Sequence, residues 1–519
     1  MARFTFSELT PTAFLRRSAD VYAQRTALVD GDLRLTYREL HDRCLAGTGV
    51  LAGFDIGPGD RVAVLATNSH VLLEMHHAVP LRGAVLVPLN IRLSAEELTY
   101  ILEHSGASLL VLTEEFAGLG RQVADRVGIP SLLAGPDGDY ERLLAGAVPA
   151  EVPCEDERAL LGINYTSGTT GRSKGVMIHH RGAYLQSLSL LVHNRMDGDT
   201  AYLWTVPMFH CNGWCLTWGI TAIGGLHVCL RAIDPERIWR LLREEGVTHF
   251  SAAPTVLTMI AAAEAAAGPR LERRIKVQTG GSPPSPTLLT RMDRLGMDVT
   301  HLYGLTETFG PIGINEWQSE WDALDADDQA ALRARQGVGN VIAEPLRVVD
   351  ETGRDVPRDA ETIGEIVARG NDVMLGYYRD VEATDAVDLD GWFRTGDLAV
   401  HHPDGYVEIR DRAKDIIITG GENVASVEVE RVIDSHPDVE ESAVVGVPDE
   451  RWGEVPVAFV RPRPGAELTA EQVTGHVREH LAGFKVPKQV FFRELPKTST
   501  GKIQKQVLRE ASRESQAPA

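Results

Sequence analysis

Residues 165–176 read YTSGTTGRSKGV, a stretch rich in hydroxyl side chains and glycine that also carries two cations. It directly follows the apolar run 159–163, which has the composition of a buried strand. A strand that feeds a glycine-rich loop at the carboxyl edge of a parallel sheet is a common ligand-binding position in α/β proteins. Glycine lets the backbone approach an anion closely, because it has no Cβ and tolerates positive φ. The stretch therefore predicts a polyphosphate-binding loop. Its candidate donors are Thr166, Ser167, Thr169, Thr170 and Lys174.

This loop differs from the standard P-loop, which has the pattern G-x-x-x-x-G-K-[ST] and places its last hydroxyl on Mg²⁺. Here Gly168 and Gly171 are three residues apart, and Lys174 is followed by Gly175. A ligand for the metal ion that accompanies a polyphosphate must therefore come from elsewhere in the chain. The alternative interpretation of the stretch alone is a polar surface loop.

The segments on either side of the loop alternate between short apolar strands and amphipathic helices. A strand at 84–90 precedes a helix at 94–106, in which Ser94 and Glu97 are spaced as a capping box. The same rhythm recurs across 227–304. Strand–helix–strand alternation predicts parallel, doubly wound α/β sheets.

The pattern of predicted secondary structure changes twice further along the chain. From about residue 337 short strands and turns predominate, which predicts a β-rich subdomain. Helices at 427–439 and 468–483 then alternate with strands again. We therefore expect a large N-terminal domain, residues 1–411, that includes the β-rich subdomain, and a small α+β C-terminal domain, residues 412–519.

Length and composition restrict the class of protein. A chain of 519 residues is too long for one ordinary hydrophobic core, so more than one domain is expected. Hydrophobic residues make up 43% and charged residues 24%, which is typical of globular proteins. The formal net charge of -21 disfavours nucleic acid and anionic lipid as partners. A polyanion site must consequently be built locally, from backbone N–H groups and a few cations.

The five cysteines are few and odd in number, which favours a reducing compartment over a disulfide framework. Cys211 and Cys215 lie beside His210 but lack the C-x-x-C spacing and a second ligand pair, so buried thiols are favoured over a metal site. The first twenty residues contain no apolar signal-peptide core, and no run is long enough to span a bilayer. The last residues, SQAPA, are not a peroxisomal signal. A cytoplasmic location is expected.

Six stretches together resemble the adenylate-forming superfamily of acyl-CoA synthetases, adenylation domains and luciferase-like enzymes. The resemblance covers nearly the whole chain, and the stretches occur in the family's order. They are YTSGTTGRSKGV (165–176), VPMFHCNGW (206–214), HLYGLTET (301–308), WFRTGDLA (392–399), IRDRAKDIIITGGENV (409–424) and PKTSTGKIQK (496–505). Within the superfamily, MFHCNGW, TGGENV and VEVE are most similar to medium-chain acyl-CoA ligases and plant-type acyl-activating enzymes.

The resemblance implies a two-step reaction with ATP, Mg²⁺ and coenzyme A as cofactors. A carboxylate attacks the α-phosphate of ATP to give an acyl-adenylate and pyrophosphate, and the thiol of coenzyme A then displaces AMP. The first step needs no general base, because a carboxylic acid of ordinary pKa is ionised at pH 7. It needs charge neutralisation, because one anion must approach another.

Roles in the large domain are carried over from the matching motif positions. Glu307 is implied as the magnesium ligand, a role that suits a carboxylate. Thr306 would donate to the α-phosphate, and His210 would lie near the nucleotide and the acid carboxylate. Trp214 would form a wall of the acid pocket, although a buried aromatic is more often core. The remaining implied contacts are the ring of Tyr303 on adenine, the turn at Gly281, Ser282 and Pro283 around adenine, Asp397 on the ribose, Arg412 on the nucleotide, Gly168 and Gly171 in the loop, and Gly280 and Gly304 in the acid pocket.

The resemblance also implies that the C-terminal domain moves between the two steps. Lys502, in PKTSTGK, would bridge the carboxylate and the α-phosphate during adenylation, as the fourth catalytic residue with Glu307, Thr306 and His210. The thiol must later enter where this ammonium was, so the domain would swing about Lys414. After the swing, Gly420, Gly421 and Glu422 would line the tunnel for the pantetheine arm of coenzyme A.

One position departs from the family pattern, and two rival functions stay open. The glycine that usually precedes the arginine of the hinge motif is Asp411 here, as it is in several acyl-CoA ligases. The same adenylation chemistry can load a carrier-protein thiol or a nitrogen nucleophile in a natural-product pathway. A catalytically inactive nucleotide-binding scaffold is disfavoured, because both Lys502 and Glu307 are present. The sequence does not identify the acid, and a homodimer is an open option.

Overall fold

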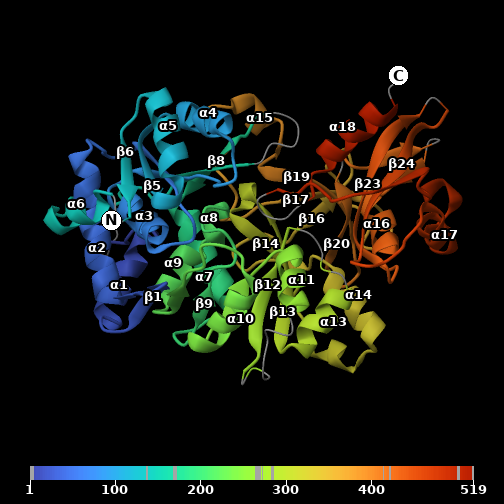
Figure 1. The fold of residues 1–519 in the computed structure, drawn as a ribbon, viewed down its shortest axis with the longest axis horizontal. Coiled ribbons are helices and arrows are strands. Elements are labelled where there is room, and N and C mark those ends of the chain that lie inside the picture. The colour runs from blue at the N-terminus through green and yellow to red at the C-terminus, as the bar shows by residue number, and fades with distance from the viewer. Residues whose placement is uncertain are drawn as a thin grey trace.

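The computed structural model describes most of the chain, and the predicted fold class is confirmed. The N-terminal part contains two mixed α/β sheets, a β-rich subdomain follows it, and a smaller C-terminal domain ends the chain (Figure 1). None of the helices in the described ranges is long and apolar enough to cross a membrane. The described residues are 5–135, 138–166, 172–263, 271, 273–281, 284, 286–412, 414–419, 422–449, 451–498 and 503–516.

The first sheet has six strands, and all neighbours are parallel except the last pair. Its central strands are apolar at nearly every position because both faces are covered. Val62 and Val64 point into one core cluster, whereas Ala63 and Leu65 point into another. In spatial order the strands are β6 (Ser131–Ala134), β5 (Ala107–Thr113), β3 (Arg61–Leu65), β4 (Val85–Pro88), β7 (Leu160–Tyr165) and β8 (Gly175–His179).

The second sheet has nine strands, with a parallel centre and antiparallel strands at both edges. Its faces are likewise both covered, since Tyr202 lies in one cluster and Leu203 in another. In spatial order the strands are β15 (Val338–Gly339), β14 (Gly310–Ile314), β13 (Met297–Leu305), β12 (Ile275–Thr279), β11 (His249–Ser251), β9 (Ala201–Leu203), β10 (Leu226–Val228), β1 (Thr26–Asp30) and β2 (Leu33–Thr36).

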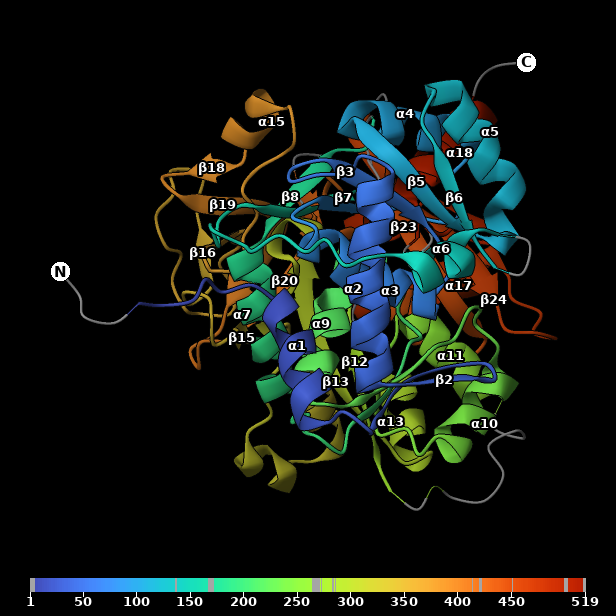
Figure 2. The same cartoon turned by 90° about the vertical axis from the view of Figure 1, so that its left-hand side faces the viewer.

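Helices between the two sheets form the largest core cluster, and others cover the outer faces. In Figure 2, α2 and α3 lie between the strands of the first sheet above and those of the second below, and α3 contacts strands of both. The inner helices are α1 (Thr12–Val21), α2 (Tyr37–Gly53), α3 (His70–Leu81), α6 (Tyr140–Gly146), α7 (His180–His193), α8 (Cys211–Trp214) and α9 (Leu216–Ala222). The remaining helices before the β-rich subdomain are α4 (Ala95–Ser105), η1 (Glu114–Phe116), α5 (Ala117–Val127), α10 (Pro235–Glu244), α11 (Pro254–Ala262), α13 (Pro286–Arg294), η2 (Thr306–Thr308), η3 (Ser319–Ala323) and α14 (Ala326–Ala334).

The β-rich subdomain and the C-terminal domain each contain a five-stranded sheet. The first consists of β16 (Arg347–Val349), β17 (Gly364–Ala368), β19 (Trp392–His401), β18 (Asp388–Leu389) and β20 (Val407–Arg412), with α15 (Val381–Asp385). The second consists of β22 (Glu422–Val424), β21 (Ile417–Thr419), β24 (Gly453–Pro462), β23 (Val439–Asp449) and β25 (Gln489–Phe492), with α16 (Ser426–Asp434), α17 (Ala470–His480), η4 (Gly483–Lys485) and α18 (Lys505–Gln516).

The predicted start of one helix is confirmed, whereas the helices predicted over 427–439 and 468–483 are both too long, the second being α17, Ala470–His480. Ser94 and Glu97 form the expected capping box at the start of α4. The helix predicted over 427–439 ends at Asp434, and β23 begins at Val439. Pro437 explains the early end, because a proline disfavours helical geometry in the residue before it and cannot itself donate to the helix ladder.

Candidate active site

The phosphate loop connects two antiparallel strands and is closed at its base. The N–H of Thr166 donates to the carbonyl of Lys174 at 3.0 Å, and Tyr165 pairs with Gly175 across β7 and β8. The expected strand and ligand-binding edge are present, but the strand that follows returns beside β7 instead of starting a helix. Residues 167–171, which carry the predicted loop contacts Ser167, Gly168, Thr169, Thr170 and Gly171, lie outside the described residues.

Lys174 lies over the ring of Tyr377, a residue to which the sequence assigned no role. The Lys174 Nζ is 4.7 Å from the centre of the Tyr377 ring, within the range of a cation–π contact. The Tyr377 hydroxyl donates to Glu307 Oε1 at 2.8 Å. Burial, and next the charge of Glu307, raise the pKa of Tyr377, so the phenol stays protonated and donates. Tyr377 therefore contacts both Glu307, the predicted metal ligand, and Lys174, which is predicted to bind phosphate.

Backbone hydrogen bonds explain how Tyr377 reaches this position. The segment after β17 runs along β8, and the N–H of Tyr378 donates to the carbonyl of Gly175 at 2.7 Å. The N–H of Met374 donates to the carbonyl of Glu307 at 2.8 Å. Three segments that are far apart in sequence are thus joined at the carboxyl edge of the first sheet.

Asp397 connects the predicted adenine residue, Tyr303, with the predicted nucleotide contact Arg412. The Tyr303 hydroxyl donates to Asp397 Oδ2 at 2.8 Å, and Arg412 Nε lies 2.7 Å from Asp397 Oδ1. Asp397 and Arg412 are direct partners in the β19–β20 ladder. Each carboxylate oxygen has a second lone pair, which leaves Asp397 able to accept ribose hydroxyls. Tyr303 is only 7% exposed and belongs to the core cluster of the β-rich subdomain, so both interpretations of this residue have a structural basis.

His210 and Thr306 are brought together through Cys211. The Cys211 thiol lies 3.5 Å from the Thr306 hydroxyl and 3.9 Å from His210 Nε2. Loss of hydration lowers the pKa of His210 to about 4, so its imidazole is neutral at pH 7. Cys211 and Cys215 are buried free thiols, as expected.

Trp214 is positioned by a left-handed turn that the sequence did not predict. Residues 211–215 all have positive φ, between 42° and 61°. Only one of the five is glycine, and such geometry costs about 1–2 kcal/mol per L-residue. The turn is held partly by the Ser187 hydroxyl, which donates to the Cys215 carbonyl at 2.9 Å. Strain of this kind is found where the surrounding structure over-determines a functional segment.

The turn presents the indole of Trp214 to two glycines. A Cβ added to Gly280 would lie 3.5 Å from the indole, and one added to Gly310 would lie 3.0 Å from it. The ring therefore covers the ends of β12 and β14 closely, as a wall residue would. Gly281 next to it has φ +89°, and an added Cβ would meet nothing within 4 Å. Of the predicted adenine turn, Ser282 and Pro283 lie outside the described residues.

Asn68 holds the start of the acid-side motif, VPMFHCNGW (206–214), from a distant segment. Its Nδ2 donates to the carbonyls of Trp204 and Val206 at 2.8 and 3.0 Å, and its Oδ1 accepts from the N–H of Met208 at 2.8 Å. Asn68 is 8% exposed. The sequence contains no local signal for this contact, because the two segments are 140 residues apart.

The predicted hinge segment is anchored on the C-terminal domain. Asp411 accepts from both the N–H and the hydroxyl of Ser426, the latter at 2.7 Å. The same hydroxyl accepts from Lys505 Nζ at 2.6 Å. Arg509 pairs with Asp415 and also donates to the carbonyl of Lys414 at 3.4 Å. The aspartate at position 411 is thus a buried carboxylate that joins the hinge segment to α16.

The remaining C-terminal predictions are only partly covered by the structure. Glu422 is exposed and pairs with Thr419 across β21 and β22. Gly420, Gly421 and Lys502 lie outside the described residues.

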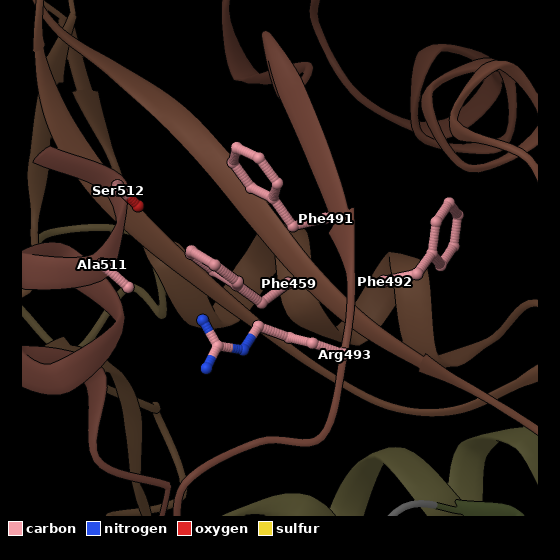
Figure 3. Close-up of a pocket in the computed structure, with 6 residues that line it drawn as sticks. All are labelled: Phe459, Phe491, Phe492, Arg493, Ala511 and Ser512. Carbon is pink, nitrogen blue, oxygen red and sulfur yellow. The ribbon is translucent and has the colours of Figure 1, made fainter. Parts of the chain in front are cut away.

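A cavity of about 390 Å³ in the C-terminal domain contains none of the motif residues. It lies between β24, β25 and α18, where the Phe459 and Phe491 rings stack 5.3 Å apart (Figure 3). Arg493 extends toward Ala511 on α18, whereas Phe492 points away on the other side of β25. This cavity is separate from the candidate active site.

The fold has two lobes, and the carboxylate of Glu307 and the ammonium of Lys174 lie on either side of Tyr377 in the larger one. These features are typical of an α/β protein that binds a nucleotide at the ends of its strands. The chain belongs to the AMP-binding enzyme family, whose model matches residues 15–378. The model of the AMP-binding enzyme C-terminal domain matches residues 428–502.

Characterised relatives align over almost the full length. An acetate–CoA ligase of Humulus lupulus is 44% identical, covering 98% of this chain and 95% of the relative. A peroxisomal acetate/butyrate–CoA ligase of Arabidopsis thaliana is 42% identical, with the same coverage. A 4-hydroxybutyrate–CoA ligase of Metallosphaera sedula is 41% identical, covering 97% of this chain and 94% of the relative.

Solved structures of one related protein distinguish two arrangements. The chain superimposes on ATP-bound MatB from Rhodopseudomonas palustris with a TM-score of 0.88 and on apo MatB with a TM-score of 0.76. Both comparisons have 30% identity and cover 98% of this chain and 100% of MatB. The arrangement seen here is therefore closer to that of the ATP-bound protein.

Proposed function

We propose that this chain is an ATP-dependent acid–coenzyme A ligase. It forms an acyl-adenylate with release of pyrophosphate, and then a thioester with release of AMP. The observation that carries the proposal is the contact of Tyr377 with both Glu307 and Lys174. Through this contact, the Glu307 carboxylate is available to bind Mg²⁺ and the nearby Lys174 ammonium is available to bind phosphate. The first step requires both.

The described residues suit the two cofactors of the first step. Glu307 would hold Mg²⁺, which neutralises phosphate charge when bound. Lys174 and the hydroxyls of Thr166 and Thr306 would contact phosphate oxygens, and Asp397 would accept from the ribose. The neutral imidazole of His210 adds no charge beside the incoming carboxylate and can donate or accept one hydrogen bond. Lys502 would supply the positive charge between the two reacting anions.

The second step requires Lys502 to leave, and we place the rotation at Lys414. The proposed units are residues 1–411 and 412–519. Two contacts support an arrangement poised for the first step: the Asp411–Ser426 hydrogen bonds and the 3.1 Å pair between Glu408 and Arg431. A swing at Lys414 would separate both pairs. Gly420, Gly421 and Glu422 would then face the pantetheine arm.

The acid that we propose is a small aliphatic carboxylate. Trp214 supports this, because its indole lies against Gly280 and Gly310 and shortens any pocket between them. The relatives named for acetate, butyrate and 4-hydroxybutyrate agree in size. A cytoplasmic location suits the free thiols of the chain. A homodimer would be tested by the mass of the purified protein in solution.

Pyrophosphate release with a panel of acids tests the donor, and mass analysis of the product with and without coenzyme A tests the acceptor. We expect acid-dependent pyrophosphate release that is greatest with acids of two to about six carbons, and a coenzyme A thioester as the product. A product whose yield ignores coenzyme A would instead favour a carrier-protein or nitrogen acceptor. No pyrophosphate with any acid would favour the inactive scaffold.

A further inference from the structure

Helix α17 carries two imidazoles and a carboxylate on one side. His476, Glu479 and His480 each offer one ligand atom, and these atoms lie within 4.8 Å of one another. Positions i, i+3 and i+4 are neighbours on a helix surface, so the three side chains converge by the geometry of the helix alone. His476 is half-buried, and the other two are exposed.

Hydrogen bonds hold both imidazoles in the form that binds a metal. The Ser435 hydroxyl donates to the Val432 carbonyl at 2.7 Å, so its oxygen accepts from His476 Nε2 at 2.8 Å. His480 Nδ1 donates to the carbonyl of His476 at 2.8 Å. These partners place the protons on His476 Nε2 and His480 Nδ1, which leaves lone pairs on His476 Nδ1 and His480 Nε2. Ligating histidines typically donate their second ring N–H to such an acceptor.

We propose that His476, Glu479 and His480 bind a zinc ion. Two imidazoles and a carboxylate form a donor set that suits Zn²⁺, whereas Mg²⁺ and Ca²⁺ prefer oxygen ligands only. A tetrahedral ion needs its ligand atoms about 3.4 Å apart, so small rotations of the two exposed side chains close the site. Water completes the coordination.

His436 is a neighbour of the site and not a ligand. Its ring centre is 5.2 Å from that of His476, at an angle of 87°. Its Nδ1 accepts from the N–H of Asp438 at 3.2 Å, which places the ring proton on Nε2. The lone pair of this imidazole is therefore already used.

The site is structural and does not depend on the proposed ligase function. Helix α17 lies at the outer margin of the C-terminal domain, away from β13 and β19, which carry Tyr303 and Asp397 (Figure 1). A bound ion would stabilise the last turn of α17. Because His476 contacts Ser435, it would also strengthen the connection of α17 to the end of α16. Binding to the folded form alone stabilises that form by mass action.

Zinc titration of the full-length chain, stripped with a chelator and monitored with a competing chromophoric chelator, tests the proposal. We expect one tight ion per chain, and at least tenfold weaker binding in H476Q, H480Q and E479Q. Variant S435A should weaken binding by about tenfold, because it removes the acceptor that orients His476. The matched control is E471Q, which makes the same charge change on an exposed residue of the same helix and should bind as the wild type does.

Two outcomes would overturn the site. One is wild-type binding no tighter than that of the H476Q/H480Q double variant. The other is an equal effect of E471Q and E479Q, which would reduce the role of Glu479 to net charge. All substituted side chains are exposed or half-buried, so each variant should keep the wild-type far-ultraviolet circular dichroism spectrum, which verifies that it is folded.

Discussion

The hydroxyl of Tyr377 donates to Oε1 of Glu307 at 2.8 Å while its ring supports the ammonium of Lys174. Replacement of Tyr377 by phenylalanine keeps the ring and removes only the hydrogen bond. A hydrogen bond to a charged group contributes about 1.5–3 kcal/mol, so we expect the rate of adenylate formation to fall by about 10- to 100-fold. The Mg²⁺ concentration for half-maximal rate should rise, because Glu307 loses its orienting partner. Tyr378→Phe is the matched control, and equal loss in both variants would contradict the role.

Lys502→Ala should abolish the first step and spare the second. One lost charge contact to a developing transition state typically costs about 100- to 1,000-fold. Pyrophosphate release measures adenylate formation, and thioester formation from supplied acyl-adenylate measures the second step. Equal loss in the two assays would refute the role that we assign to Lys502.

Trp214→Ala should change which acids are accepted. Removal of the indole opens the space beside Gly280 and Gly310, and one methylene in a pocket is worth about 1–3 kcal/mol. The ratio of kcat/KM for hexanoate to that for acetate should therefore rise by about tenfold or more. Trp321→Ala serves as the control, because Trp321 is a half-buried tryptophan that contacts Trp317 and Tyr406 edge-to-face. An unchanged acid profile would make Trp214 a core residue.

Ser426→Ala should slow the first step selectively. The Ser426 hydroxyl contacts both Asp411 and Lys505, so its loss loosens the hinge segment in the arrangement closer to ATP-bound MatB. We expect adenylate formation to fall roughly tenfold, with thioester formation from supplied acyl-adenylate nearly unchanged. The surface variant Ser435→Ala should affect neither step. Equal slowing of both steps by Ser426→Ala would show a general loss of structure.

Stability should fall as the pH is lowered from about 6.5 to 4. Loss of hydration lowers the pKa of five histidines to about 3 or 4, so the unfolded chain binds more protons than the folded one in this window. Burial raises the pKa of Asp372 to about 7 and that of Asp434 to about 8, which acts in the opposite sense but for fewer groups. Urea denaturation at pH 7 and pH 5 checks this, and a higher midpoint at pH 5 would contradict it. The histidines are His76, His180, His210, His227 and His301.

Local patterns were sufficient for most of the fold. The apolar runs that became β3, β4 and β5 and the capping box of α4 are decided by neighbours in sequence, which is why the sequence alone predicts them. Motif order was likewise sufficient to single out Glu307 and Lys174, which both contact Tyr377. The end of α16 was missed, although Pro437 was a readable signal.

The amino-acid sequence by itself determined the family, the order of the motifs and the types of residue that chemistry at a polyphosphate requires. Only the tertiary structure decided that Tyr377 holds Glu307, that Asn68 holds the acid-side motif, and that Asp411 meets Ser426. The physical reason is distance along the chain. A hydrogen bond between residues 70 or 140 positions apart leaves no period or spacing in the sequence, and exists only once the sheets have brought their strand ends together.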